Sequence, residues 1–178
     1  MALAVGVNSY VDITACTSYL ADRLFTEAWT VAPPEQQASS LIMATRAIDR
    51  HNIIGVPKDN TQLLQFPRRY PFQLHSLWKT WYGKYIEKNE WTPVYLEAMS
   101  WWVEENVPSL VIDAVCEEAL ALLERGGTSR LRLQRSGVRS MGIGGASESY
   151  APGSGKGLLS QEAKEIMRRY FVTGVGIT

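Results

Sequence analysis

PPEQQASSLIMATRAIDRHNIIGVPKDNTQLLQFPRR, residues 33–69, is the stretch of sequence that decides the fold. Pro33-Pro34 suits the first turn of a helix, where the fixed φ of proline fits and its missing N–H is not needed. The apolar side chains that follow recur at i, i+3, i+4, i+7 and i+10, which places them on one helical face: Ala38, Leu41, Ile42, Thr45 and Ile48. We predict a core helix over residues 33–50.

The second half of this stretch reads as a loop with an anchored end. Gly55 and Pro57 interrupt regular structure, and the loop closes with Phe66-Pro67-Arg68. We expect Phe66 to plug the end of a helical bundle and Pro67 to stop regular structure from continuing.

Composition sets broad limits on the rest of the chain. The 178 residues suffice for one domain, and a hydrophobic content of 46% suffices for a real core. The formal net charge is zero, so no global field draws the protein to nucleic acid or to an anionic membrane. Residues 1–7 lack the basic region of a secretory signal, and no apolar run reaches the ~18 residues of a membrane span. We expect synthesis and folding in the cytoplasm.

Two further helices and a connector accompany the predicted core helix. Asp12 is placed to cap a helix that carries Ala15, Tyr19 and Leu20. Residues 25–32 read as a connector anchored by Trp29. Val107-Pro108 precedes the most apolar helix, which glycines at 126–127 end; its inward positions are Ile112, Val115, Cys116, Ala119, Leu122 and Leu123.

Residues 70–106 form an aromatic-rich insertion that we predict to be a helical hairpin. Its aromatic residues are Trp78, Trp81, Tyr82, Tyr85, Trp91, Tyr95, Trp101 and Trp102. These residues suit three alternative roles: packing in the core, contact with another protein, or stacking on the bases of a nucleic acid. Trp101 and Trp102 are neighbours and cannot both face one core, so at least one is expected at a partner contact.

The character of the chain changes after residue 127. Residues 128–143 alternate polar and apolar side chains, which predicts a β-hairpin turning at Ser136-Gly137 or one extended arm. The segment carries an arginine ribbon without acids: Arg130, Arg132, Arg135 and Arg139. We favour a subunit contact, with the acidic stripe of Asp113, Glu117 and Glu124 as a candidate partner, over contact with DNA phosphate.

The C-terminal part reads as a linker followed by an arm. Residues 144–157 are rich in Gly, Ser and Ala, as flexible linkers are. GSGKG at 153–157 is no phosphate loop, because Tyr150 and Gly157 stand where that pattern needs a glycine and a hydroxyl residue. In the arm, residues 158–178, Ser160 is placed to cap a short helix containing Ala163, Ile166 and Met167.

Residues for catalysis or metal binding do not form a recognisable set. His51 and His75 lie in different elements without ligand spacing, and Cys16 and Cys116 read as reduced, buried thiols. The carboxylate pairs at 104–105 and 117–118 read as solvated helix faces. We therefore predict no enzyme activity, no cofactor and no metal.

Four segments, in order, resemble the head-tail adaptor (head completion, connector) proteins of tailed bacteriophages. They are VGVNSYV at 5–11 leading to YLADR at 19–23, LIMATRAID at 41–49 with QLLQFPR at 62–68, the Val107-Pro108 helix, and LLS at 158–160 with RRYF at 168–171. Many such sequences carry the label of DnaT-like single-stranded DNA-binding proteins. The insertion at 70–106 departs from the resemblance.

The resemblance implies a mainly α protein of the virion neck. Such adaptors form a ring, typically dodecameric, between the portal protein and a tail-side neck or tail terminator protein, with DNA passing through the channel and no membrane partner. The expected units are a helical domain at 1–127, the segment at 128–143, the linker at 144–157 and the arm at 158–178. The arm is expected to anchor on the portal through Leu158, Leu159, Ile166, Met167, Tyr170 and Phe171, so its deletion should leave a folded protein. The alternative function is a single-stranded DNA-binding or primosome-like module acting through residues 130–139 and the tryptophans.

Overall fold

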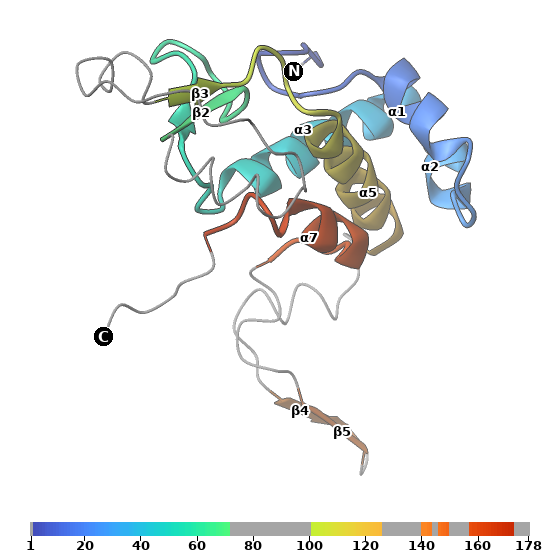
Figure 1. The fold of residues 1–178 in the computed structure, drawn as a ribbon. Helices are drawn as coiled ribbons and strands as arrows, with labels where there is room; N and C mark the ends of the chain where they lie inside the picture. Colours follow the sequence, from blue (N-terminus) through green and yellow to red (C-terminus); the bar gives the residue numbers. More distant parts are fainter. Residues whose placement is uncertain (1, 72–100, 126–139, 144–145, 150–156, 173–178) are drawn as a thin grey trace, which may run out of the picture.

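The computed structural model describes residues 2–71, 101–125, 140–143, 146–149 and 157–172 (Figure 1). Its helices are α1 (Ile13–Leu20), α2 (Glu27–Val31), α3 (Pro34–Asp49), α5 (Ser109–Arg125) and α7 (Gln161–Met167). A small antiparallel sheet of three strands joins them. The prediction of a mainly α fold is thus confirmed in outline. None of the described helices is both long and apolar enough to cross a membrane.

Helices α3 and α5 form the centre of the core, as the periodicity of their apolar residues predicts. Leu41, Ala44 and Ile48 of α3 are fully buried, and so are Val111, Val115 and Ala119 of α5. Pro34 stands at the start of α3, where the predicted helix begins. The buried face of each helix can therefore be predicted from the spacing of its apolar residues.

The N-terminal helices pack on this pair. Asp12 caps α1 by accepting a hydrogen bond from the Ala15 amide at 2.7 Å. Trp29 is buried, and its indole N–H donates to Thr17 Oγ1 at 3.1 Å, so the predicted anchor is confirmed within a connector that forms α2. Cys16 and Cys116 are buried and free, as predicted. Their mutual hydrogen bond and burial raise the pKa of Cys116.

The C-terminal segment folds back onto α5 and completes the core. Leu158, Met167 and Tyr170 are buried, while Leu159, Ile166 and Phe171 are partly buried. The Ser160 hydroxyl accepts a hydrogen bond from the Ala163 amide at 3.1 Å, which confirms the predicted cap. Leu158, Met167 and Tyr170 therefore belong to the chain's own core.

Short strands occupy the two ends of the aromatic-rich insertion. Strand β1 (Val56–Pro57) pairs with β2 (Arg68–Pro71), which pairs with β3 (Trp101–Val103). The predicted helical hairpin is wrong at these ends, because backbone pairing of Arg69 with Val103 and of Tyr70 with Trp102 replaces it. Residues 72–100 lie outside the described residues.

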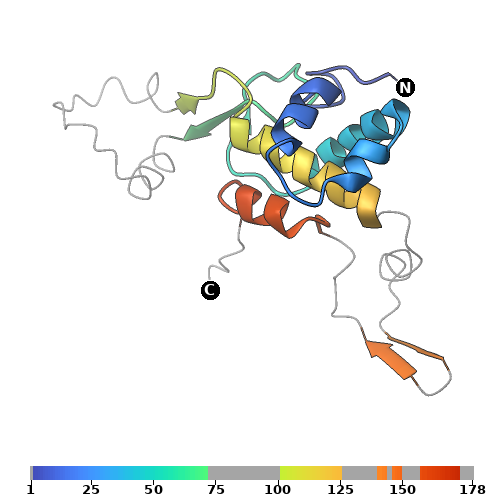
Figure 2. The ribbon, with the colours of Figure 1, turned by 90° about the vertical axis from the view of Figure 1, so that its right-hand side faces the viewer.

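A separate hairpin joins β4 (Ser140–Ile143) and β5 (Ala146–Ser149) and lies away from the helices in both views (Figures 1 and 2). Its first strand falls in the predicted strand segment, but its partner lies in the predicted linker. The pairing of Ile143 with Ala146 leaves a two-residue connection whose sequence, Gly-Gly, suits a tight hairpin loop. The predicted turn at 136–137 lies outside the described residues.

Candidate functional site

Arg68 lies at the centre of a buried polar cluster. Its side chain is only 3% exposed, and its guanidinium donates five hydrogen bonds of 2.6–3.0 Å. The acceptors are the carbonyls of Ile53, Ile54, Gly55 and Gln65 and the Gln65 side-chain oxygen. A planar guanidinium can donate to all of these acceptors because its five N–H groups point in several fixed directions. Arg68 therefore fixes the loop between α3 and β1.

Phe66 connects this cluster to both ends of the chain. Its ring is buried and meets Tyr10 and Tyr170 edge to face, with centroids 5.9 Å and 5.2 Å away. The Tyr10 hydroxyl accepts a hydrogen bond from the Phe66 amide and donates one to Asp49 at the end of α3. The expected plug at the end of the bundle is thus observed, and it is built from residues far apart in sequence.

Glu104 is the acidic member of the cluster. It is buried, and its carboxylate accepts hydrogen bonds from the Arg68 amide at 3.0 Å and from the Tyr70 hydroxyl at 2.9 Å. Burial raises the pKa of Glu104 above its usual value, although these hydrogen bonds and the charge of Arg68 act in the opposite direction. The prediction of a solvated carboxylate pair is therefore wrong for Glu104 and holds for Glu105, which is exposed.

The raised pKa predicts how stability depends on pH. A carboxyl with a raised pKa in the folded state contributes stability that is complete below its unfolded pKa and is lost as pH rises through the folded value. The unfolding free energy of wild type, minus that of Glu104→Gln, should therefore fall as pH rises above about 4.3, the ordinary pKa of a glutamate. Urea unfolding across this range measures it. A difference that stays constant or rises with pH would contradict the assignment.

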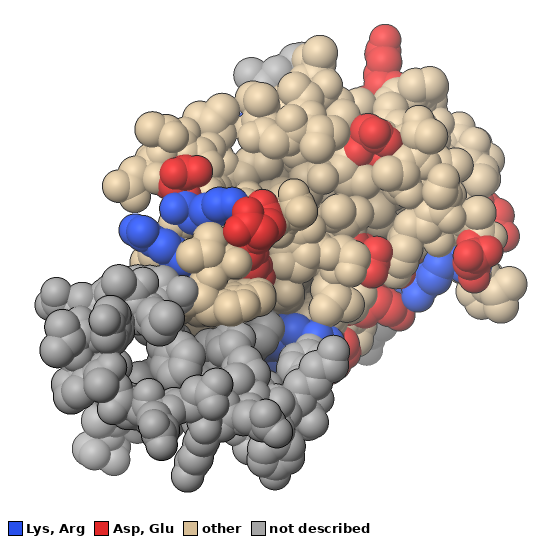
Figure 3. Space-filling view, turned by 45° about the horizontal axis from the view of Figure 1, so that its top comes forward, with Lys and Arg blue, Asp and Glu red and all other residues tan. Residues whose placement is uncertain are grey.

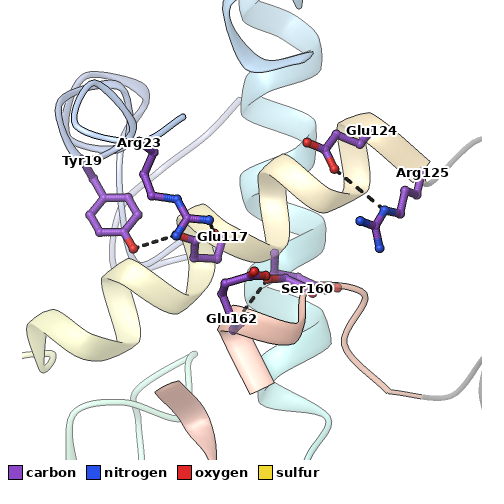
Figure 4. A network of polar contacts seen from close by, with 9 residues as sticks. Tyr19, Arg23, Glu117, Glu124, Arg125, Ser160 and Glu162 are labelled. Carbon is purple, nitrogen blue, oxygen red and sulfur yellow. Dashed lines mark hydrogen bonds and ion pairs between the residues drawn. The ribbon is translucent and has the colours of Figure 1, made fainter. Parts of the chain in front are cut away.

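A second polar network joins α5 to α1 and α7 (Figure 4). Glu117 accepts a hydrogen bond from the Tyr19 hydroxyl at 2.7 Å and pairs with Arg23 at 2.9 Å. Glu118 accepts hydrogen bonds from the amides of Leu159 and Ser160 at 2.8–3.0 Å. Both carboxylates are buried, so the prediction of a solvated pair is wrong here, as is the role of Glu117 in an exposed acidic stripe.

Glu118 is one of the contacts that hold the C-terminal segment, and its removal should have a measurable cost. In Glu118→Gln an amide NH₂ replaces one oxygen and faces the amide donors of residues 159–160. We expect the free energy of unfolding to fall by ~1.5–3 kcal/mol, the usual value of hydrogen bonds to a charged group. Glu124→Gln, on a more exposed position of the same helix, is the matched control and should stay within ~0.5 kcal/mol. Equal effects of the two changes would refute the link.

An aromatic pair lies at the surface of the three-stranded sheet. Trp102 is 40% exposed, and its ring lies 5.6 Å from that of Tyr70, with 31° between the planes. Tyr70 is buried and held by Glu104, so Trp102 rests on a fixed support. On the opposite face, Arg69 pairs with the exposed Val56 and Val103. This end of the sheet could receive a flat, apolar ligand group.

Charge near this sheet is mixed. The Lys58 ammonium lies 3.1 Å from the Glu105 carboxylate. Figure 3 shows basic and acidic side chains next to one another on this side of the molecule, with no extended field of one sign. Among the described residues, no group of three or more His, Cys, Asp or Glu side chains could hold a metal ion.

The remaining predicted contact residues are only partly placed. The arginine ribbon of Arg130, Arg132, Arg135 and Arg139 lies outside the described residues, as does the side chain of Trp101. One signal was overlooked in the sequence. Residues 68–84 contain no acid, and basic residues alternate there with aromatic ones: Arg68, Arg69, Tyr70, Phe72, Trp78, Lys79, Trp81, Tyr82 and Lys84. Such interleaving is typical of single-strand binding segments.

Comparison with known proteins corrects the predicted identity. A family described as "Putative DnaT-like ssDNA binding protein" matches residues 2–176, and no curated protein or solved structure matches. The identification as a head-tail adaptor was wrong, because this match supports single-stranded DNA binding and nothing in the comparisons points to a portal or a virion neck. Since the match covers nearly the whole chain, the protein belongs to the DnaT-like ssDNA-binding family.

Proposed function

We propose that this protein binds single-stranded DNA. The observation that carries the proposal is the family match over residues 2–176. Proteins that bind single strands without reading sequence combine cationic side chains along the phosphates with aromatic rings on which bases stack. The formal net charge of zero does not oppose this function, because binding depends on where charges lie rather than on their sum.

The exposed Trp102 is the proposed stacking position on the sheet. Its ring rests on the buried Tyr70. Because the indole is already held in place, less side-chain conformational entropy is lost when a base stacks on it. It also ends the segment that begins with the acid-free, aromatic-rich residues 68–84. A base placed on Trp102 would lie beside β2, because Tyr70 pairs with Trp102 and the half-buried Arg69 pairs with the next residue, Val103.

The proposal is tested by replacing this ring. In Trp102→Ala, affinity for a fluorescein-labelled oligo-dT should fall by about tenfold or more, since one stacked base is worth ~1–3 kcal/mol. Phe25→Ala is the matched control: Phe25 is 79% exposed in the connection between α1 and α2, and these two helices lie on the opposite side of the molecule from β2 and β3 (Figure 1). Anisotropy titrations measure both. Equal affinities of the two variants and wild type would remove Trp102 from the site.

A further inference from the structure

We infer that a basic edge at the C-terminal end of α3 binds the phosphates of single-stranded DNA; this rests on the proposed function. The basic edge comprises Arg46, Arg50, His51, Arg168 and Phe171. It lies on elements that were not predicted to contact DNA, and it is distinct from the arginine ribbon and from Trp102. Its parts come from the end of α3 and from the residues that follow α7, two segments far apart in sequence.

Backbone pairing brings these two ends together. The residues after α7 run past the end of α3 (Figure 1). There the Ile54 amide donates to the Tyr170 carbonyl at 2.8 Å, and the Val172 amide donates to the Asn52 carbonyl at 2.9 Å. Since Ile53 forms a bridge with Phe171, the position of residues 168–172 relative to α3 is fixed.

A stacked pair of rings lies at this junction. The rings of His51 and Phe171 are 4.4 Å apart and nearly parallel, at 13°. The His51 Nδ1 lies 2.9 Å from the Ala47 carbonyl, which sets the orientation of the imidazole. Both residues are partly exposed, so the stack reaches the surface and offers ring edges and faces to a base.

Cationic side chains surround the stack. Arg46 lies in the last turn of α3 and Arg50 is its C-cap residue; both are exposed, and no side-chain hydrogen bond or ion pair of either is found among the described residues. The side chain of Arg168 is 75% exposed. Its guanidinium comes no closer than 3.9 Å to the carboxylate of Glu165, which is itself largely exposed. Such a long, solvated contact leaves the guanidinium able to bind another anion.

Acidic groups do not cancel this charge. Asp49 is the nearest acid on α3, but its carboxylate is turned to the Tyr10 hydroxyl and the Gln65 amide. Glu165 is the acid on α7 near Arg168. Of the three exposed arginines, only Arg168 forms an ion pair with an acid among the described residues, and the three come from two segments that backbone pairing holds side by side. That arrangement suits successive phosphates of an extended strand.

Arg50→Glu tests the inference, with Arg125→Glu as its control. Both arginines are exposed at the C-terminal end of a helix, and both changes alter net charge equally. We expect Arg50→Glu to weaken oligo-dT binding by about tenfold at ~50 mM salt, because one phosphate contact to a single strand contributes a slope of about −0.7 to log K against log salt. The double variant Arg46→Gln/Arg50→Gln should lower that slope by about 1.4. Circular dichroism melts show whether each variant is folded.

The outcomes separate this inference from the function on which it rests. Selective loss in Arg50→Glu and in the double variant, with Arg125→Glu unchanged, supports the basic edge. If wild type binds and all variants bind equally well, the basic edge is refuted while single-strand binding stands. If wild type does not bind oligo-dT at low salt, both are refuted. A duplex competitor that displaces oligo-dT as well as a single strand does would overturn the preference for single strands.

Discussion

Replacing Arg68 with methionine is expected to lower the free energy of unfolding by ~3–5 kcal/mol, the cost of removing one partner from a buried charged cluster. Arg68 is 3% exposed, and its guanidinium serves backbone carbonyls at Ile53, Ile54, Gly55 and Gln65. Without it these carbonyls lose their donor in a region closed to water. The nearby carboxylate of Glu104 also loses a compensating charge, which contributes to the expected loss.

Two comparison variants make this prediction specific. Arg68→Lys retains the charge, but one ammonium cannot reach the same set of acceptors, so its stability should fall between those of wild type and Arg68→Met. Arg125→Met removes a guanidinium that is largely exposed and should change stability by less than ~0.5 kcal/mol. Urea unfolding followed by circular dichroism measures all three. A loss below about 1 kcal/mol in Arg68→Met would show that the cluster does not organise the fold.

Deleting residues 158–178 is expected to abolish cooperative folding. The deletion removes Leu158, Met167 and Tyr170 from the core, and burial of each such side chain is worth ~1.5–3 kcal/mol. It also leaves the buried Glu118 carboxylate without the amides of Leu159 and Ser160. Together these losses approach the whole stability of a typical domain, ~5–15 kcal/mol. The sequence-based expectation that this truncation leaves a folded protein is thus reversed.

A shorter truncation is the control for this prediction. Removing residues 173–178 leaves Tyr170 in the core and Val172 hydrogen-bonded to Asn52, so a cooperative thermal transition close to that of wild type is expected. Thermal melts of the two truncated chains, compared with full-length protein, distinguish them. A sharp wild-type-like transition in the longer deletion would mean that the C-terminal segment is dispensable for the fold.

Local patterns allowed part of the fold to be predicted. Helices α3 and α5 each present one apolar face over several turns, and caps at Asp12 and Ser160 need only a few neighbouring residues. Strands β2 and β3 are too short for a period to be visible, and about 30 residues separate them. Their pairing is decided by tertiary contacts, which is why a helical hairpin was predicted there.

The buried carboxylates illustrate the same limit. Glu117 and Glu118 look solvated on a helical wheel, because acidic residues rarely lie in a core unless they have partners. The partner of Glu117, Tyr19, is 98 residues away in sequence, and the amide of Leu159 is 41 residues from Glu118. The sequence around Glu117 and Glu118 does not reveal either partner. Only the folded chain brings these donors to the two carboxylates.

The candidate site was less predictable than the fold. The total charge is no argument against DNA binding, since zero is a sum over 18 basic and 18 acidic residues and carries no positional information. The acid-free, aromatic residues 68–84 were visible in the sequence and could have supported the alternative function. The basic edge was not visible, because residues 52–54 and 170–172 come together only when the C-terminal segment folds back beside the end of α3.

The most direct test of the account is a titration of wild-type protein into fluorescein-labelled oligo-dT, followed by anisotropy, beside a labelled duplex. The account predicts saturable binding to the single strand that weakens between about 50 and 200 mM salt as counterion release requires, and weaker binding to the duplex. No change in anisotropy of the single strand at the lower salt concentration would contradict single-stranded DNA binding as the function of this protein.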